Sequence, residues 1–325
     1  MTVRTGSISG AFIWRRVHSL MGFWLFLYLT IHLLTNSQAA LWVGDDGIGF
    51  VRLVNFLESL PYLQVVETVL IGIPLAIHGI WGIKRVLEAK SNDRGHSGEA
   101  PSLPYSRNRA FTWQRITSWI LLFGILGHVV QMRFLDAPKK IKGSGGELFF
   151  TKLRFDEGLY TLAPRLQTSI FYRPDVEKAA YALSQMPIDQ LEKPGKGKIF
   201  SPEEDEQRVS IQEEVEKREF FAMLSSYRLA SDQVVAVSSS PGTAFLLMVR
   251  DTFKKPIMAV LYTIFVLAAA FHACNGFWTF LIAWGAILSY RSQKAMLPVS
   301  LIGMAFLSFL GLAAIWCSYW INLRY

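Results

Sequence analysis

Acidic residues are nearly absent from the apolar parts of this sequence, and closely spaced histidines are absent from all of it. Glu67 is the only Asp or Glu in five long apolar runs, and no two of the six histidines stand three or four residues apart. Zinc and di-iron sites on helices use histidines and carboxylates at such spacings. The sequence therefore excludes both kinds of site from the apolar runs.

Cysteine and phosphate-binding motifs are also scarce. The only two cysteines, Cys274 and Cys317, lie in apolar runs, where a free cysteine usually acts as a small buried hydrophobe. Segment 136–255 has no Cys and no His, so neither a disulfide nor a zinc site holds it together. The glycine pattern GxGxxG is missing as well, and no nucleotide site is expected.

Long apolar runs are what the sequence has in abundance, since 51% of its residues are hydrophobic. Each run is long enough to cross the roughly 30 Å hydrocarbon core as a helix. The first is longer than the apolar part of a signal peptide and contains His32, so we expect it to stay as a span. The sequence predicts an all-α membrane protein with five transmembrane helices, at roughly 12–40, 62–83, 112–134, 256–289 and 297–321.

Charge sets the expected orientation. Basic residues are concentrated before the first span, between the second and third spans, and between the fourth and fifth. The positive-inside rule then places the N-terminus in the cytoplasm and the C-terminus outside. The chain divides into spans 1–3 in 1–135, an extracytoplasmic insert of mixed structure in 136–255, and spans 4–5 in 256–325.

The insert carries no recognisable catalytic or metal-binding motif. Its charges balance, and Gly, Pro and Ser cluster at its turns. The stretch 201–230 opens with Ser-Pro and acidic residues, which predicts one long helix. The stretch 232–240, "DQVVAVSSS", predicts a short strand that ends in a turn.

Histidines inside the first four apolar runs are the main functional signal. His32, His78, His128 and His272 lie one in each of these runs, and the fifth run has none. A polar group in hydrocarbon costs several kcal/mol unless it is paired. A single such histidine is as often a packing residue as a functional one, but four facing each other suit a flat cofactor with two axial imidazoles. That cofactor is haem.

Depth in the membrane suggests how these histidines pair. At 1.5 Å per residue, His32 lies about 24 Å from the basic inner rim, and His128 lies about 20 Å from it. His78 lies only about 9 Å from the same rim. We therefore expect His32 and His128 to form an outer pair.

His272 is ambiguous, because the fourth apolar run is longer than a span requires. Counted from Lys255 it is an inner residue, and counted from Arg291 it is an outer one. The need of His78 for a partner favours the inner position. Three glycines stand four residues from one of these four histidines and could leave room for a porphyrin, although glycine is common in membrane helices anyway. They are Gly82, Gly124 and Gly276.

Basic and polar residues at the inner rim are candidate contacts for haem propionates, although the positive-inside rule explains the basic ones equally well. His18 is assigned to this rim rather than to an axial position, because it has no partner at its depth. His96 lies in a polar loop and is expected to be solvated. The candidates for propionate contact are Arg15, Arg16, His18, Ser19, Lys84 and Arg115.

Four stretches built around these histidines resemble one known family, the cytochrome b subunit of succinate dehydrogenase and fumarate reductase. The likeness is to its single-chain, five-helix, two-haem type and covers most of 12–134 and 256–321. The stretches are "FIWRRVHSLMGFW", "ESLPYLQVVETVLIGIPLAIHGIWGI", "WQRITSWILLFGILGHVVQMR" and "FHACNGFWTFLIAWGAILSYRSQ".

This resemblance implies two b haems, with His78 and His272 on an inner, high-potential haem and His32 and His128 on an outer, low-potential one. It implies a flavoprotein and an iron–sulfur subunit docked on the cytoplasmic face, in a bacterial cytoplasmic membrane, and menaquinone as the quinone. The chain would carry electrons rather than act on succinate, and it could hold the quinone site. Lipid and quinone are the expected further partners, and nucleic acid is not. Members of the family join the third and fourth helices by a short loop, so the insert at 136–255 is a departure.

Two other functions fit part of the pattern. One is the di-haem cytochrome b of a nitrate reductase or a formate dehydrogenase, which also has five helices and two haems. The other is a transporter with a histidine proton relay, which predicts acidic partners at the same depth and inverted repeats. The stretches "HGIWG" and "HACNGFW" favour the succinate dehydrogenase type.

Glu67 is the candidate for proton transfer to a quinone. It precedes His78 by 11 residues, or about three helical turns, so the two share a face about 16 Å apart. That places Glu67 near the outer histidine pair, where burial would raise its pKa. The alternative is an interfacial residue that reaches water beside Tyr62 and has no chemical role.

Overall fold

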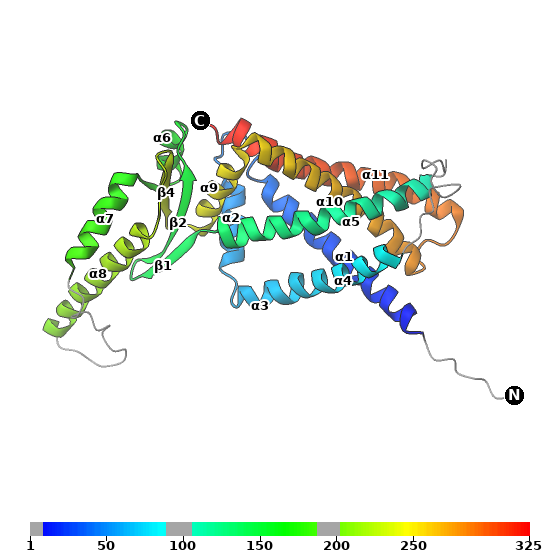
Figure 1. The fold of residues 1–325 in the computed structure, drawn as a ribbon, viewed down its shortest axis with the longest axis horizontal. Coiled ribbons are helices and arrows are strands. Elements are labelled where there is room, and N and C mark those ends of the chain that lie inside the picture. Colours follow the sequence, from blue (N-terminus) through cyan, green and yellow to red (C-terminus); the bar gives the residue numbers. More distant parts are fainter. Residues whose placement is uncertain (1–8, 89–105, 187–201) are drawn as a thin grey trace, which may run out of the picture.

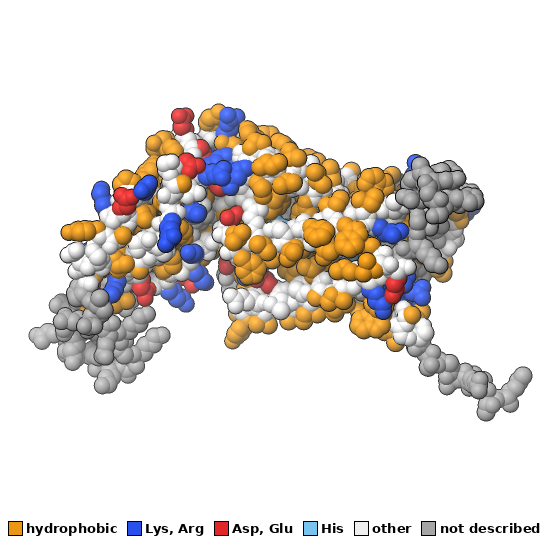
Figure 2. Space-filling model, viewed as in Figure 1, with side chains coloured by type: hydrophobic (Ala, Val, Ile, Leu, Met, Phe, Trp, Pro, Cys, Tyr) orange, Lys and Arg blue, Asp and Glu red, His pale blue; other side chains and the backbone are white. Residues whose placement is uncertain are grey.

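The computed structural model describes residues 9–88, 106–186 and 202–325. Among these residues, five helices are long and apolar enough to span a membrane, which confirms the five predicted spans. Their side chains are apolar on the outside of the bundle, as Figure 2 shows, and charged residues gather at its two ends. The spans are Gly10–Ser37, Leu63–Glu88, Asn108–Leu135, Pro256–Ala283 and Tyr290–Asn322.

Three of the spans change from α- to π-helical winding. The second consists of α3 (Leu63–Glu67), the π-turn η1 (Thr68–Gly72) and α4 (Ile73–Glu88). Pro74 has no N–H to give to the carbonyl of Leu70, and the indole Nε1 of Trp24 donates to that carbonyl instead, at 2.6 Å. The other two spans are α5 (Ser106–Val129) with η2 (Val130–Leu135), and α11 (Tyr290–Leu312) with η3 (Ala313–Asn322).

The fourth span, α10 (Pro256–Ala283), lies at the centre of the bundle. It packs against α5, α11 and the first span, α1 (Gly10–Ser37), and α1 also packs against α4 (Figure 1). α10 ends at Ala283, before Gly285, whose φ of +79° leaves the helical region. The fourth predicted span, which ended at residue 289, was therefore six residues too long.

The insert forms a four-stranded antiparallel sheet in the order β1-β2-β4-β3. Its predicted long helix and short strand are confirmed as α8 (Pro202–Ser225) and β4 (Gln233–Ser238). The sheet itself was not predicted, so the mixed structure is more regular than the sequence suggested. The other elements are β1 (Lys139–Gly143), β2 (Gly146–Arg154), α6 (Leu159–Arg165), β3 (Ser169–Phe171), α7 (Arg173–Gln185) and α9 (Pro241–Phe253).

The sheet is joined to one end of the bundle through a shared apolar core. One face of the sheet packs under α7 and α8 around Phe150, which is fully buried. The other face packs on α9, which in turn packs against α2 (Ile48–Glu58), a helix between the first two spans. The N-terminus of α1 and the bundle ends of α4 and α5 near residues 88 and 106 lie at the opposite end (Figure 1).

A buried arginine links the insert to the last span. Arg250 on α9 is 1% exposed and donates to both carboxylate oxygens of Asp156, at 2.7 and 2.6 Å. Its Nε donates to the carbonyl of Leu323 at 2.7 Å, and its guanidinium lies over the ring of Tyr319. Burial by itself would raise the pKa of Asp156, but the hydrogen bonds and charges of Arg250 and Lys254 outweigh it and lower that pKa. We call this group of residues the Arg250 latch.

Candidate functional site

The structure brings the four histidines together in two pairs. The ring centres of His32 on α1 and His128 on α5 lie 5.9 Å apart, with the ring planes at 82°. Those of His78 on α4 and His272 on α10 lie 6.3 Å apart, with the planes at 79°. His32 with His128 is the pair expected from depth, and His78 with His272 is the pair expected because His78 needs a partner.

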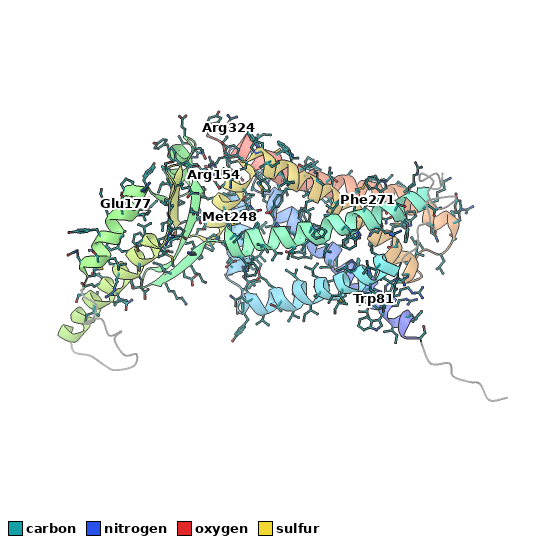
Figure 3. The ribbon with its side chains drawn as sticks, viewed as in Figure 1. Trp81, Arg154, Glu177, Met248, Phe271 and Arg324 are labelled. Atoms are coloured by element: carbon teal, nitrogen blue, oxygen red, sulfur yellow. The ribbon has the colours of Figure 1, made fainter. Side chains whose placement is uncertain are left out.

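The helix ends show that His78 and His272 lie at the same depth in the bundle. His272 lies 11 residues before Ala283, the end of α10, and His78 lies 10 residues before Glu88, the end of α4. Figure 3 places Phe271 and Trp81, close in sequence to these histidines, in the half of the bundle away from the sheet, whereas Met248 lies at the sheet end. The pair His78–His272 is therefore the one farther from the insert.

Both separations suit two imidazoles on opposite sides of one metal ion. An imidazole nitrogen binds a metal at about 2.0–2.1 Å, which puts two opposed ring centres roughly 6 Å apart. Among the described residues, no group of three or more His, Cys, Asp or Glu could hold a metal by itself. A donor set of two imidazoles and nothing else fits a macrocycle that brings its own four nitrogens, such as haem.

Hydrogen bonds on Nδ1 orient both inner histidines. Nδ1 of His78 lies 3.1 Å from the backbone carbonyl of His18, which can only accept. Nδ1 of His272 lies 3.3 Å from the hydroxyl of Thr117, whose proton goes to the carbonyl of Trp113. In both cases Nδ1 is the donor, so the opposite nitrogen, Nε2, keeps its lone pair for a metal.

The outer histidines are held differently from each other. Nδ1 of His128 lies 3.2 Å from the hydroxyl of Tyr262 on α10. For His32 the nitrogen in contact is Nε2, which lies 3.5 Å from the side-chain amide of Asn36, one turn further along α1. The same amide donates to the carbonyl of His32 at 2.8 Å. Binding of a metal through Nε2 of His32 would therefore have to displace this weak contact.

His18 lies closer to the inner pair than the sequence suggested. Its ring stacks on the ring of His78, with centres 4.1 Å apart and planes at 9°, so it does share a depth with another histidine. The expectation that it has no partner at its depth was wrong, because counting along a helix ignores the direction in which a side chain points. Stacked rings at this separation leave no space for a metal ion between them. Nδ1 of His18 is buried and has no hydrogen-bond partner.

The basic residues of the rim contact aromatic rings in this structure. The guanidinium of Arg16 lies 4.5 Å from the ring centre of Phe12 and 5.3 Å from that of Trp284. Lys84 lies 5.1 Å from the Trp81 ring, and Arg115 lies 6.0 Å from the Phe111 ring. Arg15 and Ser19 stand on the same end of α1. Contact of these residues with propionates stays a prediction, and His96 lies outside the described residues.

The three predicted glycines face side chains of neighbouring helices. A methyl group added at Gly124 would approach Cδ2 of Phe265 to 2.5 Å, whereas at Gly82 and Gly276 the nearest atoms, on His18 and Gln114, are 3.7 and 3.8 Å away. Gly22 on α1, which sequence reasoning missed, is tighter against the site, because a methyl there would lie 2.8 Å from Cε1 of His78.

Glu67 forms an ion pair instead of standing alone in the membrane. Its Oε2 accepts from Nη2 of Arg133 at 2.7 Å, and its side chain is 38% exposed. The proton-transfer role of Glu67 stays a prediction, as does the alternative of an interfacial residue. Glu58 interacts electrostatically with both Glu67 and Arg133. Its pKa is raised by burial, with Arg133 opposing the shift and Glu67 adding to it.

Sequence comparison gives one informative relative. The chain is 23% identical over 305 residues to the succinate dehydrogenase cytochrome b558 subunit of Bacillus subtilis (strain 168). The match covers 94% of this chain and 95% of the relative. It confirms the resemblance seen in the histidine-centred stretches and, with the five apolar helices, supports an integral membrane protein. No protein-family model and no solved structure matches the chain.

Proposed function

We propose that this chain is the di-haem cytochrome b membrane anchor of a succinate:menaquinone oxidoreductase, in the direction of either succinate oxidation or fumarate reduction. The observation that carries the proposal is the pair of histidine contacts, 5.9 Å for His32–His128 and 6.3 Å for His78–His272. The Bacillus subtilis relative is a succinate dehydrogenase cytochrome b558 subunit, which supports the proposal. Bound haem would supply one-electron transfer.

The residues of the chain have distinct parts in this proposal. His78 and His272 would hold an inner haem, and His32 and His128 an outer one. Thr117 and the carbonyl of His18 fix the direction of the inner ligands. The two histidine pairs would thus hold one redox group in each half of the bundle, between the proposed iron–sulfur subunit and the quinone.

The end of the bundle away from the insert is the proposed cytoplasmic docking face for the iron–sulfur subunit and its flavoprotein. It carries Arg15, Arg16, Lys84, Arg115 and Arg291. This assigns the N-terminus to the cytoplasm and the insert to the outside, as the positive-inside rule predicts.

The outer end holds the proposed quinone region. Glu67 and Arg133 lie there as a partly exposed ion pair, with Glu58 beside them. A carboxylate at the end of the bundle nearer the outer histidine pair is suitably placed to exchange protons with a quinone.

Purification of the chain from its native membrane tests the assignment. We expect a b-type absorbance spectrum and co-purification with a flavoprotein that oxidises succinate. Co-purification with a molybdenum enzyme would favour the nitrate reductase or formate dehydrogenase type instead. Absence of b-type absorbance from a folded preparation would reject the cytochrome, and would leave the histidine-relay transporter.

A further inference from the structure

The outer histidine His128 stands at the start of a hydrogen-bonded chain that leads out of the membrane. Its Nδ1 lies 3.2 Å from the hydroxyl of Tyr262, and that hydroxyl lies 3.2 Å from Oε1 of Gln131. Nε2 of Gln131 lies 3.1 Å from Oδ2 of Asp136, which is exposed at the end of the third span. His128 on α5, Tyr262 on α10, Gln131 on η2 and Asp136 just after η2 thus form one continuous series.

Asp136, the last residue of this hydrogen-bonded series, fixes which group donates and which accepts in every bond. An ionised carboxylate only accepts, so Asp136 requires the NH₂ group of Gln131 to face it. The amide oxygen of Gln131 then faces Tyr262 and takes the single hydroxyl proton. The oxygen of Tyr262 is left to accept, so Nδ1 of His128 must be the donor. The chain selects the tautomer of His128 with its lone pair on Nε2, the nitrogen that a metal would use.

The π-turn η2 is what makes this chain possible. Gln131 and Asp136 are five residues apart, and in an α-helix such residues point about 140° apart. In η2 the backbone N–H of Asp136 donates to the carbonyl of Gln131 at 2.8 Å, which is the i to i+5 bond of π-helical winding. The two side chains therefore come onto one face. π-turns of this kind recur at functional sites.

Aromatic packing holds Tyr262 in place on both sides. Its ring meets the ring of Phe253 edge to face at 5.3 Å, and it meets the ring of His128 in the same way at 5.8 Å. Phe265 packs against His128 at 6.0 Å and fits because residue 124 is a glycine. The packing of the Tyr262 ring therefore fixes the position of its hydroxyl.

We propose that Tyr262 is a positioning residue for the outer haem ligand and that the chain Tyr262–Gln131–Asp136 lowers the potential of the outer haem. This inference rests on the proposed function, since it requires His128 to be a ligand. A histidine that donates from Nδ1 to an acceptor is a more basic ligand and favours the oxidised iron. The inner ligand His272 has only the Thr117 hydroxyl in the matching position, and that hydroxyl continues to a helix carbonyl rather than to a carboxylate.

The test is a redox titration of the purified protein, followed by optical and electron paramagnetic resonance spectra, for wild type, Tyr262→Phe and the control Tyr28→Phe. Tyr28 has a ring beside the partner ligand His32, at 5.6 Å, so the control removes a hydroxyl near the same haem. We expect Tyr262→Phe to shift the outer couple toward the reduced form about tenfold, which is ~59 mV for one electron. The inner couple should stay unchanged, and Tyr28→Phe should change neither.

The outcomes separate the inference from the proposed function. A wild-type protein without haem b would reject the proposed function itself. Two haems in the wild type, with an unchanged outer potential in Tyr262→Phe, would overturn the inference alone. Loss of only the outer haem in Tyr262→Phe would support it. If Tyr262→Phe loses both haems, Gln131→Leu decides, because it removes the acceptor of the tyrosine proton and the link to Asp136 but keeps the ring and hydroxyl of Tyr262. A smaller upward shift of the outer couple supports the chain, and no shift refutes it.

Discussion

The bundle and the insert bury opposite kinds of side chain. In the bundle, large apolar side chains such as Phe123, at 67% exposure, point outward. The histidines His128 and His272 point inward and form hydrogen bonds with neighbouring helices. In the insert, Phe150 and Val235 are fully buried, and most charged side chains face solvent. The histidines of the bundle are therefore exceptional for their surroundings, whereas the insert has the ordinary core of a water-soluble fold.

The seam between the two regions shows how such different parts are joined. It is apolar along α2 and α9, but its centre is Arg250, a buried charge held by Asp156 and by the carbonyl of Leu323. Under the proposed function, redox chemistry belongs to the bundle, whereas the seam holds the two regions together. Changes in one should leave the other intact.

Loss of an axial ligand should have the largest effect. His272→Leu should remove the inner haem entirely and keep the outer one, because His78 alone has no opposed imidazole. His32→Leu should produce the reverse. Haem content per chain and the optical spectrum measure both variants, and each serves as the control for the other. Equal loss of both spectra in both variants would contradict the independence of the two pairs.

Breaking the Arg250 latch should affect stability without affecting chemistry. Arg250→Met leaves Asp156 at the seam without its main partner, and removal of one member of a buried ion pair costs about 3–5 kcal/mol. Limited proteolysis of the insert and thermal unfolding measure the loss. The exposed pair Arg173–Glu177 provides the control, since Arg173→Met should change stability little. Haem loss that precedes cleavage of the insert would contradict the separation of roles.

Acid should break the ion pair between Arg250 and Asp156. The pKa of Asp156 is lower in the folded protein than in the unfolded chain, where it is about 3.9. Its contribution to stability is therefore complete above about pH 4 and is lost as the pH falls through the lower folded value. Proteolysis of the insert measured between pH 7 and pH 3 should accelerate at the acid end. Asp156→Asn should weaken this acid dependence, and an unchanged acid profile in that variant would assign it to other groups.

Glu67→Gln tests the quinone region at the outer end. We expect unchanged haem content and unchanged succinate oxidation with a soluble dye, but a loss of quinone-linked turnover on the order of 100-fold. Glu147→Gln is the matched control, because Glu147 also forms an exposed ion pair, with Lys140 on the insert. Normal quinone turnover in Glu67→Gln would leave Glu67 as an interfacial residue paired with Arg133.

A single methyl group at Gly22 should have a smaller effect that is confined to the inner pair. Gly22→Ala would place Cβ 2.8 Å from Cε1 of His78, so the ligand or the helix must shift. Overpacking of this kind costs about 1–3 kcal/mol. Gly79→Ala is the control, since a methyl there meets nothing within 4 Å. The inner haem should change in affinity or spectrum only in Gly22→Ala, and equal behaviour of the two variants would contradict the packing.

The sequence predicts those features of the fold that depend only on run length and on the regular rise of a helix. Span number follows from the length of apolar runs, and the pairing of His32 with His128 follows from a fixed rise per residue. Rotation about the helix axis does not follow from such counting, which is why the stacking of His18 on His78 was missed. The ion pair of Glu67 with Arg133 could not be predicted either, because it joins two different spans.

The sheet could not be predicted because its pairings are distant in sequence. β2 pairs with β4 although the described helices α6, α7 and α8 lie between them in the chain, and β3 is only three residues long. The π-turn η2 and its effect on Gln131 also leave no periodic signal. Tyr262 could have been noted as a polar side chain in the fourth apolar run, but only the structure places it against His128.

Haem content of the purified chain is the most direct test of the central claim that two histidine pairs bind two haems. A pyridine haemochrome assay against protein concentration, combined with a redox titration of the b-type absorbance, measures both number and potential. The proposal predicts two haems b per chain, with two separate midpoint potentials and the lower one lost in His128→Leu. One haem per chain, or none, in a stably folded preparation would contradict it.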